Sequence, residues 1–413
     1  MKLTKTLTIG IEATAIGIRG SERHGVFRYL QQLLLGFRSL GVKHRFQLFF
    51  NAFSVDKNVA VPAFMNELGW DQLEAKISRF PARLRERLNL PLDRFTGPLD
   101  LFHAPSHMLP RNCSVPKIVT IHDLAFFRMT EAVKKLRGDW VAAIRSRSSN
   151  PAADIASYRQ RCNFFLGLQR GVPETLKRAD IIIAVSHATA QDLMDITGIE
   201  SSRIRVVPNG MTPGFSRIQD KGTINKATDD LGIKGPYILY VGVLDPNKDI
   251  STLLAAYAGT SDDFRHNHQL VIAGPLNWYR SILEEEAYRL GIGDRMLFTG
   301  FVPDQLLPAV YSGASVFVSP SPLEGFGFPV LEAMACGTPV IIVNAGSLPE
   351  VAGEAALSVQ PGNPGAMSAA IERLAGDQEF AASLVSAGLT RCKEFSWERT
   401  ARLTMDAYSE AAG

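Results

Sequence analysis

One short stretch, residues 314–343, constrains the fold of this chain more than any other. It begins with an apolar run, passes through a glycine-rich loop, and continues as a helical segment that stops at Gly337. A second apolar run, Pro339-Val-Ile-Ile-Val, follows at once. The stretch therefore predicts a strand–loop–helix–strand unit, the building block of parallel sheets that are covered on both faces.

The loop of this unit carries two carboxylates in a distinctive setting. Glu324 and Glu332 flank the glycine-rich turn, one before it and one in the helical segment behind it. A helix N-terminus offers free backbone N–H groups to an anion, and a nearby carboxylate accepts hydrogen bonds from hydroxyl groups. A ligand that joins a polyhydroxyl group to an anion, such as a sugar phosphate, has both parts.

The same alternation of apolar strands and helical segments occupies the rest of the chain. One series ends near residue 210, a second begins at Tyr237, and the polar residues 216–236 lie between them as a linker. We therefore expect an α/β protein with two Rossmann-like domains, residues 1–217 and 218–395, whose parallel sheets face a central cleft. Ser396 is a good N-cap for a last helix over 396–413.

Size and composition agree with two soluble domains. The chain has 413 residues, and its formal charge of 44 − 41 = +3 gives no bulk attraction to nucleic acid. The four cysteines are widely separated, so we expect no disulfide framework and no zinc site. The first residues resemble a strand more than a signal peptide, and no apolar run of about 18 residues occurs. We expect a cytoplasmic protein.

The sequence from Glu324 to Glu332, with its Gly-Phe-Gly-Phe-Pro core and the following Ala-Met-Ala-Cys-Gly-Thr-Pro, resembles a known family signature. It is similar to the motif of retaining, nucleotide-sugar-dependent glycosyltransferases of the GT4 type (glycosyltransferase group 1), which have the GT-B fold. The resemblance implies transfer of a hexose to an acceptor hydroxyl, on a glycan or a lipid-linked saccharide, in polysaccharide biosynthesis. It also implies that the last helix returns to the N-terminal domain.

The resemblance implies a GDP- or UDP-linked sugar as co-substrate and no other cofactor. The pattern around residues 241–249 and 273–278 resembles bacterial mannosyltransferases of surface polysaccharide assembly, so GDP-mannose is the leading donor. No Asp-x-Asp occurs in the chain, and we therefore expect no metal in the reaction.

Roles for single residues follow from the same motifs. Glu324 is expected to bind a hydroxyl of the donor sugar, Glu332 the ribose, and Lys248 the diphosphate, while His122 would lie beside the sugar. Further donor-side candidates are glycines and apolar residues of the loops: Gly20, Gly25, Gly242, Gly274, Phe301, Val302, Gly325, Phe326, Gly327 and Phe328. His103 and Asp123 are candidates for the acceptor side.

One departure from the family pattern concerns the diphosphate. Members commonly pair the lysine with an arginine, either directly before it or next to the preceding glycine, but this chain has Asn247 and Val243 at those places. Either one cation suffices or another basic residue substitutes, and Arg19 and Arg23 in the N-terminal loop are candidates.

Two basic segments suggest a further property. Residues 78–94 carry five arginines against two acidic residues, a net 5 − 2 = +3, with leucines between them; residues 133–147 are also basic. Such a segment is either a solvated surface or a docking site for the anionic inner face of the cytoplasmic membrane.

Three other functions compete with glycosyl transfer. An NAD oxidoreductase would need Gly-x-Gly-x-x-Gly, and Gly325-x-Gly327-x-x-Val330 fails at the third position. A non-catalytic binding protein of two α/β lobes and a GT-B enzyme of another reaction, such as a sugar-nucleotide epimerase, remain open at this point.

Overall fold

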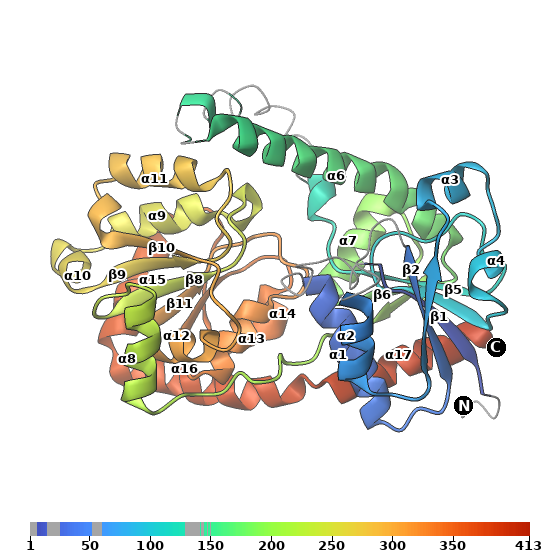
Figure 1. The fold of residues 1–413 in the computed structure, drawn as a ribbon. Helices are drawn as coiled ribbons and strands as arrows, with labels where there is room; N and C mark the ends of the chain where they lie inside the picture. The colour runs from blue at the N-terminus through green and yellow to red at the C-terminus, as the bar shows by residue number, and fades with distance from the viewer. Residues whose placement is uncertain are drawn as a thin grey trace. The chain divides into compact units, whose positions relative to one another are not determined.

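The computed structural model describes residues 6–14, 25–51, 60–128, 141, 144–146, 148 and 150–413. The chain forms two compact units (Figure 1). The first contains residues 1–124, 166–210 and 395–413, and the second contains residues 125–165 and 211–394. Each unit has its own parallel sheet, which confirms the predicted α/β class with two Rossmann-like domains.

The first unit is built on a seven-stranded sheet in the order β3-β2-β1-β4-β5-β6-β7, with every pair parallel. The register places Ile9 between Phe46 and Leu101, and all three side chains are buried. The strands are β1 (Thr8–Glu12), β2 (Arg45–Asn51), β3 (Leu73–Ser78), β4 (Leu101–Ala104), β5 (Lys117–Ile121), β6 (Ile181–Ala184) and β7 (Ile204–Val206).

Helices surround this sheet, and the last one comes from the far end of the sequence. The helices are α1 (Gly25–Ser39), α2 (Ala60–Leu68), α3 (Ala82–Arg87), α4 (Asp93–Thr96), α7 (His187–Thr197) and α17 (Trp397–Ala412). Helix α17 packs on α1 so closely that a Cβ at Gly36 would lie 2.7 Å from the carbonyl oxygen of Trp397. Thr400 of α17 also donates a hydrogen bond to the carbonyl of Pro208 at 2.7 Å.

The second unit has a six-stranded sheet in the order β10-β9-β8-β11-β12-β13, again with every pair parallel. The strands are β8 (Tyr237–Val241), β9 (Gln269–Ala273), β10 (Met296–Gly300), β11 (Val316–Ser319), β12 (Val340–Val343) and β13 (Leu357–Val359). The helices are α8 (Lys221–Asp230), α9 (Ile250–Ala258), α10 (Asp262–Asn267), α11 (Arg280–Arg289), α12 (Leu307–Gly313), α13 (Phe328–Ala335), α14 (Leu348–Ala352), α15 (Pro364–Gly376) and α16 (Gln378–Arg391).

This strand order creates a switch point between β8 and β11. From β8 the chain proceeds outward to β9 and β10, and from β11 it proceeds the opposite way to β12 and β13. In open parallel sheets, ligands bind beyond the carboxyl ends of the two strands at such a point. The loops after β8 and β11 are therefore where the second unit should bind its ligand.

The units divide the chain at other points than the expected 1–217, 218–395 and 396–413. The long helix α6 (Pro151–Arg178) contributes its first half to the second unit and its second half to the first. Within the linker expected at 216–236, residues Lys221–Asp230 form helix α8. The physical reason for placing residues 125–165 in the second unit lies in contacts of α6 that are described below.

Candidate functional site

The two loops at the switch point of the second unit bring the main predicted residues together. Lys248 follows β8, Glu324 follows β11, and the Lys248 Nζ donates to Glu324 Oε1 at 2.7 Å. Both side chains remain partly open to solvent, with 26% and 19% of their surfaces exposed. Residues that are 76 positions apart in sequence thus form one ion pair at the edge where a ligand is expected.

A short 3-10 turn, η3 (Pro246–Lys248), positions Lys248 after β8. Asp245 caps this turn, because its side chain accepts a hydrogen bond from the backbone N–H of Asn247 at 3.0 Å. Asp249 closes the turn in the left-handed conformation, with φ of 48°. The lysine therefore sits on a capped turn rather than on an unrestrained loop.

The loop that carries Glu324 is fastened at its backbone. The carbonyl oxygen of Glu324 accepts hydrogen bonds from the backbone N–H of Ser347 at 3.1 Å and from its hydroxyl at 2.9 Å. Gly346 lies beside this loop with φ of 57°, and a Cβ there would lie 2.9 Å from the same carbonyl oxygen. This fixed backbone leaves the Glu324 carboxylate as the part that meets Lys248.

Glycines allow the strand-end loops of β8 and β9 to meet. A Cβ at Gly274 would lie 1.8 Å from the carbonyl oxygen of Gly242, so no other residue fits at position 274 without a backbone shift. The backbone N–H of Gly274 also donates to the carbonyl of Gly300 at 2.9 Å. Next to it Phe301 is 39% exposed, whereas Val302 is buried.

The glycine-rich turn leads directly into helix α13. Gly327 caps the helix in the left-handed conformation, with φ of 92°. Phe326 is buried and packs edge-on against the ring of Phe328, with 5.2 Å between centroids. Gly325 and Gly327 thus stand at the N-terminus of α13, where backbone N–H groups lack partners within the helix.

Glu332 occupies a different environment from Glu324. It is 3% exposed, and its two carboxylate oxygens accept hydrogen bonds from Thr212 at 2.9 Å and from the Tyr311 hydroxyl at 3.2 Å. Its predicted contact with the ribose stays a prediction. In this structure the carboxylate joins helix α13 to α12 and to the chain around Thr212.

Replacing Glu332 by alanine is expected to lower the free energy of unfolding by roughly 2–5 kcal/mol, because two buried hydroxyls lose the carboxylate they donate to. Urea unfolding would measure the loss, with Glu379→Ala as the control because Glu379 is exposed on α16. Unchanged stability combined with lost nucleotide affinity would contradict the structural role and favour the ribose contact.

In the first unit, His122 directly follows β5. Its Nε2 lies 2.8 Å from the carbonyl oxygen of Pro105, and its ring meets that of Tyr29 edge-on, with 4.8 Å between centroids. Burial, followed by the charge of the nearby His107, lowers the pKa of His122 to about 4. The imidazole is half-buried and neutral near pH 7, and because Nε2 donates its proton to the Pro105 carbonyl, Nδ1 is left as a hydrogen-bond acceptor.

Of the candidates in the first unit that are not histidines, the structure describes Asp123 and Gly25. Asp123 is half-buried, and its carbonyl oxygen lies 3.1 Å from Nε2 of His107. Gly25 is the first residue of α1, and no atom of the other described residues lies within 4 Å of a Cβ placed there. Gly20, Arg19 and Arg23 lie outside the described residues, and so does most of the basic segment 133–147.

His103 lies in the interior rather than at an open surface. It is 0% exposed, with its Nδ1 at 2.7 Å from the Tyr408 hydroxyl and its Nε2 at 2.8 Å from the Thr120 hydroxyl. Thr120 in turn lies 3.1 Å from the hydroxyl of Tyr29. Both ring nitrogens are occupied within the unit, so this position favours a role in fastening α17 to the sheet over the predicted acceptor-side role.

The burial of His103 predicts that the stability of the protein depends on pH. Burial, with a smaller effect from His122, lowers the pKa of His103 from 6.5 to about 3, so the unfolded chain binds the proton more readily than the folded one. Stability should therefore fall as the pH drops below 6.5, by about 2 kcal/mol on reaching pH ~5. Denaturant unfolding across this range should show a steeper loss for the wild type than for His103→Gln, with His187→Gln, an exposed site, as control. Parallel curves for wild type and His103→Gln would contradict this.

No group of three or more His, Cys, Asp or Glu side chains among the described residues is arranged to hold a metal ion. Metal independence stays a prediction that chelation must test.

The structure adds two residues that sequence reasoning missed, Arg161 and Asp245. Arg161 lies on the first half of α6 and pairs with the buried carboxylate of Asp245, the cap of the Lys248 turn. Three residues earlier on the same helix, the ring of Tyr158 meets that of Trp278 edge-on, with 4.9 Å between centroids. These contacts place residues 151–165 with the second unit. No local sequence pattern predicts these contacts, because the residues that form them lie far apart in sequence.

Comparison with known proteins defines the class. Residues 23–214 match the sequence model of "Glycosyltransferase Family 4", and residues 224–391 match that of "Glycosyl transferases group 1". The chain belongs to these GT4-type glycosyltransferases and has the GT-B fold. It is therefore an enzyme that transfers a glycosyl group, and the non-catalytic alternative no longer applies.

Individual relatives agree with this class. The O-antigen chain mannosyltransferase B of Escherichia coli is 29% identical over 75% of this chain and 74% of its own length. Among solved structures, the sucrose-phosphate synthase of Thermosynechococcus elongatus superposes with a TM-score of 0.69 at 22% identity, covering 98% of each chain. Anabaena HepE in complex with UDP-glucose gives a TM-score of 0.68 at 17% identity, covering 98% of this chain and 100% of its own.

Proposed function

We propose that this enzyme moves a hexose from a nucleotide diphosphate sugar to an acceptor hydroxyl with retention at the anomeric carbon and without a metal. The observation that carries the proposal is the Lys248–Glu324 pair at the switch point of the second sheet. A bound donor would offer its diphosphate to Lys248 and its sugar hydroxyls to Glu324, and so replace the ion pair by two contacts with the ligand.

The chemistry then follows from charge. The transition state of such a transfer resembles an oxocarbenium ion, and negative charge grows on the departing diphosphate. Lys248 and the N-terminus of α13 supply positive potential where that charge appears. His122, which is neutral near pH 7, would hydrogen-bond the sugar without adding charge, and the diphosphate itself would help to deprotonate the acceptor.

Mannose is our leading sugar and GDP our leading nucleotide. The E. coli relative is a mannosyltransferase by name, whereas the HepE neighbour holds UDP-glucose. Thermal shift with GDP-, UDP- and ADP-sugars would decide the donor, and NMR of the product would show the anomeric configuration. Product of inverted configuration would contradict retention, and activity lost on adding EDTA and restored by a divalent cation would contradict metal independence.

We further propose a glycan or lipid-linked saccharide as acceptor and a peripheral position on the cytoplasmic membrane. Within the described ranges, every helix is too short or too polar to cross a bilayer. The segment 78–94 instead presents exposed leucines, Leu84 at 40% and Leu88 at 54%, close to exposed arginines. Basic and apolar side chains together favour an anionic membrane surface.

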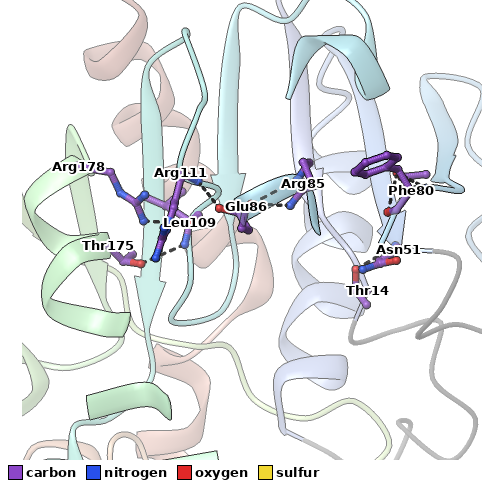
Figure 2. A network of polar contacts seen from close by, with 10 residues as sticks. Thr14, Asn51, Phe80, Arg85, Glu86, Leu109, Arg111, Thr175 and Arg178 are labelled. Atoms are coloured by element: carbon purple, nitrogen blue, oxygen red, sulfur yellow. Dashed lines mark hydrogen bonds and ion pairs between the residues drawn. The ribbon is translucent and has the colours of Figure 1, made fainter. Parts of the chain in front are cut away.

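Arg85 does not share the exposed environment of Arg79, Arg87 and Arg94. Arg85 is 8% exposed, its guanidinium lies over the ring of Phe49, and it donates to Glu86 Oε1 at 3.0 Å. Figure 2 shows this contact continuing to the backbone N–H of Arg111, which donates to Glu86 Oε2 at 2.9 Å. Arg85 therefore fastens α3 to the domain, while Arg79, Arg87 and Arg94 remain exposed.

Liposome co-sedimentation would test the membrane proposal. Binding should rise with anionic lipid, fall with salt, and weaken when Arg79, Arg87 and Arg94 are replaced by glutamate, because each basic residue contributes about 1 kcal/mol near a charged surface. Replacing the exposed Lys221, Lys226 and Lys234 of the second unit is the matched control. No binding to anionic vesicles at low salt would overturn the proposal.

A further inference from the structure

We propose that Arg161 is a positioning residue that neutralises Asp245 and thereby makes the Lys248 turn able to accept a diphosphate. The proposal deepens the function proposed above and rests on it. The guanidinium comes from helix α6, whereas the loop itself has Asn247 and Val243 where family members commonly carry an arginine.

Asp245 is a buried carboxylate that caps the turn carrying Lys248. Its side chain is 2% exposed. Its Oδ1 accepts a hydrogen bond from the backbone N–H of Asn247 at 3.0 Å, and this bond caps the turn that ends in Lys248. The other oxygen, Oδ2, pairs with the Arg161 guanidinium. A buried carboxylate without such a partner would be costly, and its charge would act on its neighbours with little screening.

The charge count of the site shows what Arg161 changes. Of the side chains in the two ion pairs, Glu324 and Asp245 contribute −2 and Lys248 contributes +1, which leaves −1 where the proposed function places a diphosphate. Arg161 brings the sum to 0. The two carboxylates act on a common neighbour: the pKa of the Tyr240 hydroxyl is raised well above its ordinary value, first by burial and then by the charges of Glu324 and Asp245.

Helix α6 holds the guanidinium in place. Tyr158 and Arg161 are three residues apart and so share one helix face. That face meets Trp278 and Asp245, which follow β9 and β8, and the Asn277 side chain donates to the carbonyl of Leu244 at 2.7 Å to join these two loops. The guanidinium also lies over the ring of Phe165, at 4.7 Å from its centroid.

The arginine side chain keeps capacity for further contacts. Its Nε is buried and has no hydrogen-bond partner among the residues that the structure describes, although 37% of the whole side chain is exposed. Direct contact with the ligand is therefore the rival explanation, and the experiment has to separate it from neutralisation.

A double-mutant cycle separates them, with GDP and UDP as probes in calorimetric titrations. Arg161→Ala should weaken binding of the preferred diphosphate about tenfold or more, because Asp245 is left unpaired beside it. Asp245→Asn keeps the cap, since its amide oxygen can still accept the Asn247 N–H. The double variant should therefore return to within a few-fold of the wild type.

Arg161→Lys should fall between wild type and Arg161→Ala, and it replaces Arg161→Ala in the cycle if the alanine variant does not fold. Arg159→Ala is the matched control, because Arg159 is exposed on the same helix. Equal binding by wild type and Arg161→Ala would overturn the inference. So would a double variant as weak as Arg161→Ala, because that result indicates direct contact with the ligand. A wild type that binds neither diphosphate would instead remove the proposed function, and this inference with it.

Discussion

Replacing Lys248 by alanine is expected to reduce kcat by about 100-fold or more, with a smaller effect on the affinity for the donor. The reason is that the ammonium group is needed most as the diphosphate departs, and loss of one such group typically costs 100–1,000-fold, or about 3–4 kcal/mol. Steady-state kinetics with the donor identified by thermal shift would measure it. The ion pair with Glu324 is partly exposed and contributes little to stability, so the loss should not arise from unfolding.

Lys234→Ala is the control for this prediction, because Lys234 is an exposed lysine of the same unit. Survival of activity in Lys248→Ala together with its loss in Arg19→Ala or Arg23→Ala would move the diphosphate role to the N-terminal loop. A rise in KM with unchanged kcat would show that Lys248 binds ground state and transition state equally.

Replacing Glu324 by alanine is expected to lower turnover about 100-fold, while the bare nucleotide diphosphate still binds, and more tightly, because Lys248 loses the opposing carboxylate. The carboxylate would accept hydroxyl groups of the sugar, which the diphosphate alone does not carry, and an unmade contact to each hydroxyl costs roughly 1–3 kcal/mol. Comparing titrations of the diphosphate with titrations of the full nucleotide sugar would separate the two parts of the ligand.

Glu324→Gln should retain part of the activity, because the amide oxygen still accepts a hydrogen bond, and Glu354→Ala, an exposed site, is the control. Wild-type turnover in Glu324→Ala with several donors would contradict the assignment. Each of the variants Lys248→Ala and Glu324→Ala also removes the ion pair between these two side chains.

The sequence predicted best where burial is strongest. The apolar run Pro339-Val-Ile-Ile-Val forms strand β12 (Val340–Val343), which pairs with β11 and β13 and is fully buried, because inner strands of parallel sheets are apolar on both faces. The sequence places Lys248 and Glu324 each just after a strand, whereas their contact depends on a strand order that the structure supplies.

An edge strand and several buried side chains could not be predicted from local sequence, for physical reasons. Strand β3 (Leu73–Ser78) was not predicted, because it lies at the edge of its sheet, is only partly buried, and carries charged residues at Glu74 and Lys76. The burial of His103 and Arg85 depends on α17 and on the ring of Phe49, which no local spacing reveals. Arg161 meets Asp245 only after distant segments have folded together.

The discontinuous make-up of the two units has a consequence for biosynthesis. The first unit needs residues 395–413, and the second needs residues 125–165 as well as 211–394. A ribosome releases the chain from the N-terminus onward, so neither unit can be completed from one uninterrupted segment as it emerges. The first unit is complete only when α17 has been synthesised, and the first half of α6 finds its partners only when the loop of Asp245 has been made.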